Sequence, residues 1–97
     1  MLNEPRQTAA PRVGPDYFTN RAKDLVAQEF NSLPEIQKPI KPDEVFIVWF
    51  AKVLQNWKVV AGIYGQRDLY FEVTYNGDLS VAYVDTYIKT RNTAYDD

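Results

Sequence analysis

The stretch that decides the fold is LYFEVTYNGDLSVAYVDTY, residues 69–87. On both sides of Asn76-Gly77, apolar or aromatic residues alternate with their neighbours, which is the period of a β-strand with two different faces. Asn-Gly between two such runs is a strong hairpin signal, because both residues accept the positive φ of a tight two-residue turn. The stretch therefore predicts an antiparallel hairpin of residues 69–75 and 79–87.

A two-residue turn would also fix the register of this hairpin. It would place Val73 opposite Ser80 and Phe71 opposite Ala82. The face that takes a covering helix would then hold Phe71, Val73, Ala82 and Val84. The other face would carry Tyr70, Glu72, Thr74, Val81, Tyr83 and Tyr87.

Two further strands are expected upstream of this hairpin. The run VFIVWF, residues 45–50, is β-branched and aromatic, which favours a strand. A buried helix is the alternative, since periodicity does not separate the two for a short apolar run. A break near Gln55-Asn56 predicts a hairpin with residues 57–64, and a second break at residues 65–68 precedes the next strand. A short helix is an open alternative for residues 85–91.

One amphipathic helix is expected before the sheet, over residues 16–33. Asp16 is the predicted N-cap, and Pro34 stops the helix. One face at helical spacing carries Phe18, Ala22, Leu25, Val26, Phe30 and Leu33. The expected fold is therefore α+β: an N-terminal helix packed on a three- to four-stranded antiparallel meander.

The domain organisation follows from the prolines, all of which precede residue 43. Residues 1–15 are expected to form a flexible tail, and residues 34–44 a stiff proline-rich connector that packs Ile36 and Ile40 on the core. Residues 16–91 would form a single domain, and residues 92–97 a frayed C-terminus. A chain of 97 residues has room for one small domain.

The composition excludes several classes of function. The chain has no Cys and no His, which excludes disulfides, thiolate nucleophiles, His-based catalysis and the usual zinc sites. The net charge is −2, and residues 43–97 hold five basic against eight acidic side chains, so no basic excess for a duplex is visible. No phosphate-loop motif or membrane-length apolar run is present, and residues 1–15 lack the continuous apolar core expected of a signal peptide. The expectation is a cytoplasmic protein without a cofactor or a membrane partner.

Three blocks of the sequence resemble a known family. The blocks are VFIVWFAKVLQNWK (45–58), YFEVTYNGD (70–78) and YVDTYIK (83–89). They are similar in order and spacing to those of small proteins of unknown function from bacteriophages and prophages of Gram-positive bacteria. The sequence departs from that pattern at Val53, where Thr is common, and at Ile88, which interrupts a basic pair. The resemblance implies a phage origin, with the host cell's cytoplasm as the location, and it implies no activity.

The aromatic residues indicate where a functional surface lies. Two Trp, seven Tyr and five Phe are many for 97 residues, and one helix covers only one face of a sheet. An uncovered aromatic face suggests association. The predicted partner-binding residues are Trp49, Trp57, Lys58, Tyr70, Glu72, Tyr83, Asp85 and Tyr87.

Each group of candidate residues has more than one interpretation. The segment LQNWK, residues 54–58, would bind a ligand or partner through its polar side chains. Alternatively it would form a hairpin turn, with Trp57 packed in the core. The carboxylates of Asp68, Glu72, Asp78 and Asp85 would serve catalysis or a metal ion, but they lack any metal-binding spacing. The tyrosines would bind a host or phage protein, or a second copy of the chain. They would alternatively stack the bases of a single-stranded nucleic acid. We predict a protein-binding function without catalysis.

Overall fold

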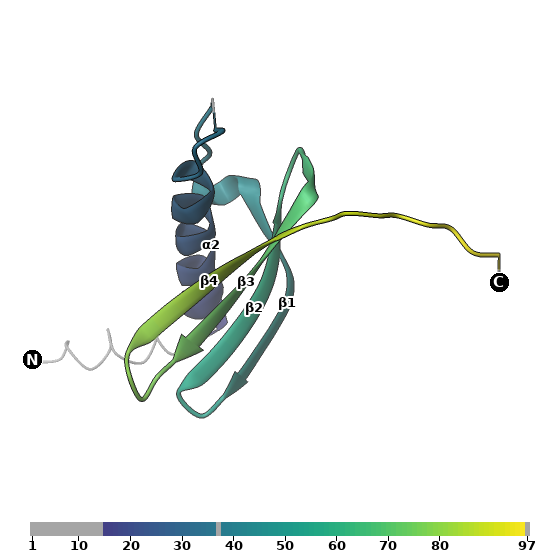
Figure 1. Ribbon diagram of the computed structural model, residues 1–97. Helices are drawn as coiled ribbons and strands as arrows, with labels where there is room; N and C mark the ends of the chain where they lie inside the picture. Colours follow the sequence, from purple (N-terminus) through teal and green to yellow (C-terminus); the bar gives the residue numbers. More distant parts are fainter. Residues whose placement is uncertain (1–14, 37, 97) are drawn as a thin grey trace, which may run out of the picture.

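The computed structural model describes residues 15–36 and 38–96 of the chain. One helix, α2 (Pro15–Asn31), lies across one face of a four-stranded antiparallel sheet of order β1-β2-β3-β4 (Figure 1). The strands are β1 (Val45–Val53), β2 (Asn56–Ile63), β3 (Gln66–Asn76) and β4 (Val81–Ile88), and a short 3-10 helix, η2 (Pro42–Glu44), precedes β1. The expected α+β fold with a meander sheet is confirmed, and residues 45–53 form a strand rather than a buried helix.

Helix α2 begins one residue before the sequence prediction. Proline is favoured at the first helical position, and Asp16 lies in the first turn of the helix rather than at its N-cap. The predicted tail, residues 1–15, lies outside the described residues except for Pro15. The helix ends at Asn31, whose side-chain amide exchanges two hydrogen bonds with the backbone of Ile40, at 2.9 and 2.8 Å. These bonds hold the connector against the end of the helix, and Ile36 and Ile40 pack on the core as expected.

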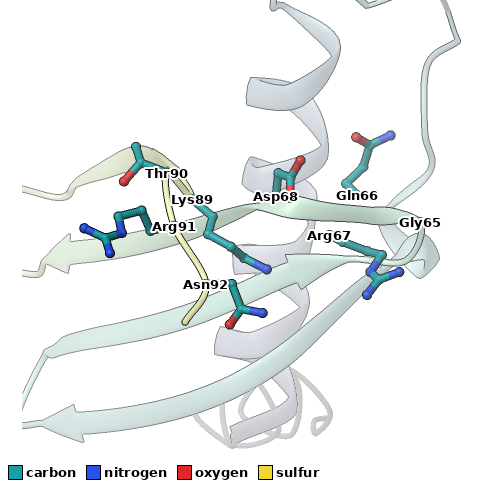
Figure 2. Close-up of a pocket in the computed structure, with 8 residues that line it drawn as sticks. All are labelled: Gly65, Gln66, Arg67, Asp68, Lys89, Thr90, Arg91 and Asn92. Carbon is teal, nitrogen blue, oxygen red and sulfur yellow. The ribbon is translucent and has the colours of Figure 1, made fainter. Parts of the chain in front are cut away.

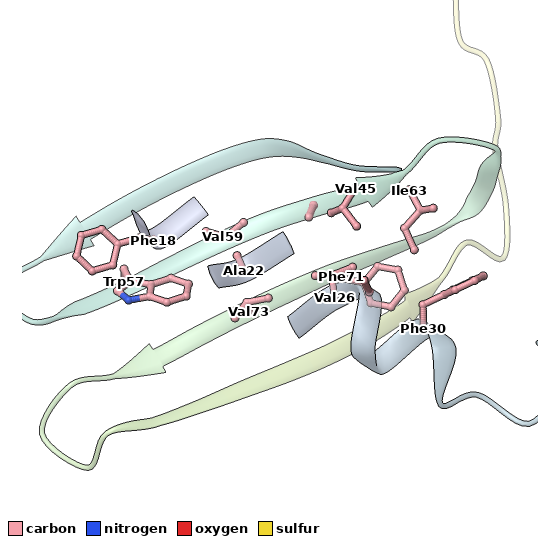
Figure 3. Close-up of a cluster of buried hydrophobic side chains, with 12 residues drawn as sticks. Phe18, Ala22, Val26, Phe30, Val45, Trp57, Val59, Ile63, Phe71 and Val73 are labelled. Atoms are coloured by element: carbon pink, nitrogen blue, oxygen red, sulfur yellow. The ribbon is translucent and has the colours of Figure 1, made fainter. Parts of the chain in front are cut away.

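The core lies between α2 and one face of the sheet (Figure 3). The helix contributes Phe18, Ala22, Val26, Ala27 and Phe30. The strands contribute Val45, Trp57, Val59, Ala61, Ile63, Phe71 and Val73. Leu25 and Leu33, which the helical pattern also selected, are half-buried at the edge of this cluster. Burial of these apolar side chains is the main driving force for the fold.

A β-bulge in β1 decides which side chains of this strand face the helix. Ile47 pairs with Ala61 and Trp49 pairs with Val60, so two residues of β1 advance the pairing by only one residue of β2. The extra residue, Val48, reverses the alternation along the strand. If Val48 were paired regularly instead, Trp49 would share the helix-covered face with Val45 and Ile47. The bulge therefore turns Trp49 to the other face.

The predicted register of the β3–β4 hairpin is wrong by four residues. Val73 pairs with Val84 rather than Ser80, and Phe71 pairs with Thr86 rather than Ala82. The turn is longer than two residues because the Asn76 side chain accepts the backbone N–H groups of Asp78 and Leu79, at 3.0 and 3.2 Å. Side chains alternate between the two faces with a period of two residues, so a shift by an even number leaves each side chain on the same face. The predicted division of side chains between the two faces is therefore correct.

The positive φ expected at Asn76 and Gly77 lies elsewhere. Ser80 has φ 54° at the end of this turn, and Leu54 has φ 55° in the β1–β2 turn. Gly77 is required for a different reason, because a Cβ there would overlap the backbone carbonyl and the side chain of Gln55. The two turns at this end of the sheet are therefore in direct contact.

The C-terminal part of the chain is a strand followed by an extended arm. β4 continues to Ile88, so the short helix considered for residues 85–91 is absent from the described residues. Residues 89–96 have no regular structure and run away from the domain (Figure 1). Within the described part of the chain, no helix has the length and apolar character needed to cross a membrane.

Candidate functional site

The candidate site is the sheet face that α2 does not cover, which we call the open face. Its side chains come from alternate positions of all four strands, and one row across it is formed by Trp49, Val60, Glu72 and Asp85. Large aromatic side chains remain exposed on it, with 50% of Trp49, 45% of Tyr70, 51% of Tyr83 and 39% of Tyr87 accessible. The face therefore presents aromatic area that the domain itself leaves uncovered.

Aromatic contacts organise one end of the open face. The rings of Tyr70 and Tyr87, which are cross-strand partners, are stacked with centroids 4.8 Å apart and planes at 12°. Phe46 and Tyr64 form a second pair with centroids also 4.8 Å apart. The Phe46 ring lies over Gly62, where a side chain would collide with it. These pairs restrict the rotamers of the rings, so less side-chain entropy is lost when a partner contacts them.

A small polar network lies among these rings. The Lys58 ammonium is 3.6 Å from Glu72 Oε2, and the Tyr87 hydroxyl donates to Glu72 Oε1 at 3.3 Å. Asp85 is the cross-strand partner of Glu72, and no cation in residues 15–36 or 38–96 forms an ion pair with it. One of the two carboxylates is thus compensated and the other is not.

The pKa of the Tyr87 hydroxyl depends on this network. The neighbouring Glu72 carboxylate raises the pKa of Tyr87 above its usual value, with smaller contributions from partial burial and from Asp85. The raised pKa favours the neutral phenol in the folded state. The stability that this interaction contributes is therefore present below about pH 10 and is lost as the pH rises through the pKa of the folded protein.

We expect Glu72→Gln to lower the pKa of Tyr87 towards its usual value, because it removes the largest contribution. The measurement is an ultraviolet phenolate titration of each protein against its Tyr87→Phe counterpart, which isolates this residue. Asp85→Asn is the matched control and should lower the same pKa by less. An equal effect of the two substitutions would contradict the hydrogen-bonded Glu72–Tyr87 arrangement.

The structure brings together seven of the eight predicted partner-binding residues. The open face holds Trp49, Lys58, Tyr70, Glu72, Tyr83, Asp85 and Tyr87. Trp57 lies on the opposite side of the sheet and is only 4% exposed, with its ring stacked on Tyr75 and tilted against Phe18. Trp57 therefore occupies the core, as the alternative interpretation of LQNWK stated, and it does not belong to the open face.

Sequence reasoning missed two aromatic residues at this site. Phe46 and Tyr64 lie at the end of the open face where β2 turns into β3. For Phe46 a signal was available, since it alternates with Val45 and Ile47, which face the core. For Trp49 the same alternation would have given the wrong face, because only the bulge at Val48 turns it outwards.

A binder of single-stranded nucleic acid also needs a positive groove, and the five basic side chains of residues 43–97 are divided among three places. Lys52 lies over the Phe18 ring, 5.5 Å from its centroid, and Lys58 is paired with Glu72. The other three, Arg67, Lys89 and Arg91, line a shallow polar hollow where β3 begins and β4 ends (Figure 2). The tyrosines therefore border a cationic group at one end, and no continuous positive groove formed by residues 15–36 and 38–96 follows them.

The four carboxylates considered for a metal ion or for catalysis do not all lie together: Glu72 and Asp85 are cross-strand partners, whereas Asp68 and Asp78 lie at opposite ends of the β3 region. Asp78 accepts a hydrogen bond from the Gln55 side chain at the turns, far along β3 from Asp68. In residues 15–36 and 38–96, no group of three or more His, Cys, Asp or Glu side chains could hold a metal ion.

Comparison with known proteins gives a family and no activity. No curated protein and no solved structure matches the chain. A family of unknown function, DUF6275, matches residues 19–97. This match runs from the second turn of α2 through all four strands and the C-terminal arm. Because it includes most of the sequence, the chain belongs to the DUF6275 family of unknown function.

Proposed function

We propose that this protein is a small binding protein that acts by protein–protein contact through the open face, without catalysis of its own. The observation that carries the proposal is the group of four exposed aromatic residues on a single uncovered face, Trp49, Tyr70, Tyr83 and Tyr87. Tyr and Trp are enriched among the residues that dominate binding energy at protein interfaces. An exposed aromatic patch on a small domain is typical of an interaction site.

The charges of the open face suit a protein surface. Lys58 and Glu72 offset one another, which leaves Asp85 as the uncompensated charge between Tyr83 and Tyr87 along β4. A basic side chain of a partner would gain a carboxylate there and two aromatic faces beside it. The preferred partner is therefore a protein segment in which a basic residue is flanked by apolar ones.

The resemblance to phage proteins supports a setting for this function. Its three blocks fall on β1 and the start of β2, on β3 with its following turn, and on β4. These are the elements that build the open face. We infer that the protein is phage-encoded and that its partner is a host or phage protein in the cytoplasm of the infected cell.

The test begins with the tagged chain of 97 residues, used to retrieve partners from infected cells. The retrieved partner is then titrated against Tyr83→Ala. Tyr17→Ala is the matched control, since Tyr17 is a similarly exposed tyrosine on α2. We expect Tyr83→Ala to weaken binding by about tenfold or more with an unchanged circular dichroism spectrum, and Tyr17→Ala to have no effect. Equal binding by both variants would remove the open face as the contact surface.

A single-stranded nucleic acid is the second candidate. The stacked Tyr70–Tyr87 pair favours it, because bases could stack on these rings close to the shallow polar hollow. Arg67, Lys89 and Arg91 line that hollow. Fluorescence anisotropy with a labelled oligonucleotide tests it at several salt concentrations. Affinity that falls steeply with salt and with Tyr83→Ala would favour this candidate, whereas affinity independent of salt would exclude it.

A further inference from the structure

Strand β4 is an open edge of the sheet. It pairs with β3 without interruption from Val81 to Ile88, and the described part of the chain places no strand on its other side. It contains no proline and a single charge, Asp85. The opposite edge, β1, carries a bulge at Val48 and the charged Lys52, two features that discourage further strand pairing. β4 is therefore the edge that can accept another strand.

A hydrogen bond at the end of β4 shows which of its residues have free backbone groups. The backbone N–H of Lys89 donates to the carbonyl of Asp68 at 2.7 Å. Successive residues of a strand direct their N–H and C=O groups to opposite sides, so the odd-numbered residues of β4 bond to β3. The groups that point outward belong to Ala82, Val84, Thr86 and Ile88.

The C-terminal arm has the properties of a strand without a partner. Residues 89–96 are exposed, contain neither Gly nor Pro, and extend away from the domain in line with β4 (Figure 1). Tyr95 is 86% exposed and Ile88, at the root of the arm, 69%. By strand parity, Lys89, Arg91, Thr93 and Tyr95 continue the open-face positions of β4.

We propose that the arm of one copy adds to the β4 edge of a second copy, and the reverse, in a two-fold symmetric dimer. Charge sets the register, because no cation in the described ranges pairs with Asp85 and Arg91 of the other copy supplies a guanidinium. Antiparallel pairing of Asp85 with Arg91 places the two Ile88 residues opposite one another on the axis. It also pairs Ala82 with Ala94 and Val81 with Tyr95.

This register agrees with the free backbone groups. The even-numbered residues of β4 meet even-numbered residues of the arm, so outward N–H and C=O groups face one another. Asp85 and Arg91 then form a pair without mutual backbone hydrogen bonds, the type in which side chains lie closest. A register that pairs Asp85 with Lys89 instead would place Ala82 opposite Asn92, and it would lose the apolar contact between the two Ile88 residues.

The dimer goes beyond the proposed function and does not rest on it, because it uses the edge of the sheet rather than the open face. The two-fold axis of an antiparallel strand pair is perpendicular to the sheet. Both open faces would therefore point to the same side and form one continuous surface. A partner-binding variant such as Tyr70→Ala should leave the dimer intact.

The first test measures the mass of the full chain by light scattering over a range of concentrations. We expect twice the mass of one chain. Arg91→Glu should raise the dissociation constant of the dimer by about tenfold or more, and the double variant Asp85→Lys/Arg91→Glu should restore it. A chain that stays monomeric up to about 1 mM, or a dimer that Arg91→Glu leaves unchanged, would overturn the proposal.

The second test locates the axis with a disulfide, which is practicable because the chain has no Cys. Ile88→Cys is expected to give a covalent dimer on mild oxidation, since residues directly opposite in a hydrogen-bonded pair are about 5.5 Å apart between Cα atoms. Thr90→Cys is the matched control. Its two copies would be offset by four residues along the strands, about 13 Å, and should not cross-link. Equal cross-linking of both variants would overturn the register.

Discussion

Substituting Trp57 by alanine is expected to lower the free energy of unfolding by about 3–5 kcal/mol. The indole is 4% exposed and lies between Phe18 of α2 and Tyr75 of β3, with ring centroids at 5.8 and 5.3 Å. Its removal leaves a cavity where the first turns of the helix meet the sheet. Because small domains are stable by only about 5–15 kcal/mol, a large part of the population should be unfolded in mild urea.

The control for this prediction is the other tryptophan. Trp49 is half exposed on the open face, so Trp49→Ala should lower the free energy of unfolding by less than about 1 kcal/mol. Urea denaturation followed by far-ultraviolet circular dichroism compares the two variants without relying on the fluorescence that each one loses. If Trp49→Ala were as destabilising as Trp57→Ala, the assignment of the two residues to opposite faces would be wrong.

Gly77→Ala should have the second largest effect on stability, about 2–4 kcal/mol. An added Cβ would overlap the Gln55 carbonyl, which is backbone and cannot rotate away. Separating the two turns would also break the hydrogen bond from the Gly77 N–H to Asn56 Oδ1 at 2.8 Å, and the bond between the side chains of Gln55 and Asp78.

Gly65→Ala is the matched comparison, again by urea denaturation. Gly65 has φ +88° and open space around it, so alanine there costs only backbone strain of about 1–2 kcal/mol. The expected order of stability is wild type, Gly65→Ala, Gly77→Ala. The reverse order of the two variants would show that the turns separate easily and that turn φ, rather than contact between turns, decides the role of glycine.

Local patterns in the sequence were sufficient for the elements and for most of their faces. The spacing of Phe18, Ala22, Val26 and Phe30 predicts the buried side of α2, and the alternation in residues 69–87 predicts the two sides of β3 and β4. Both patterns have the period of a single element, so they are readable without knowledge of its neighbours.

The features that were not predicted depend on contacts between distant residues. The β3–β4 register depends on a turn whose Gly77 rests against Gln55, 22 positions earlier in the sequence. The outward orientation of Trp49 depends on one unpaired residue in β1, and no local signal in VFIVWF marks it. The core position of Trp57 depends on the packing of α2 over the start of β2. Tertiary contacts thus decided what propensity left open.

The sequence was sufficient to predict which residues share the open face, but not how their side chains contact one another. The alternation of side chains along each strand was enough to place Tyr70, Glu72, Tyr83 and Tyr87 on the same face. The pairing of Glu72 with both Lys58 and the Tyr87 hydroxyl requires side-chain positions in three strands, which no spacing rule supplies.

The bulge at Val48 has a consequence for how this protein can change over generations. Upstream of it, Val45 and Ile47 hold the core, whereas downstream Trp49, Ala51 and Val53 face outwards. Substitutions at the three outward positions can accumulate without altering the packed layer. Deletion of Val48 would remove the bulge and keep the inward and outward sides of the rest of β1, because Trp49 would then follow Ile47 directly in a regular strand. Loss of the unpaired residue alone would therefore leave Trp49 on the open face and the packed layer unchanged.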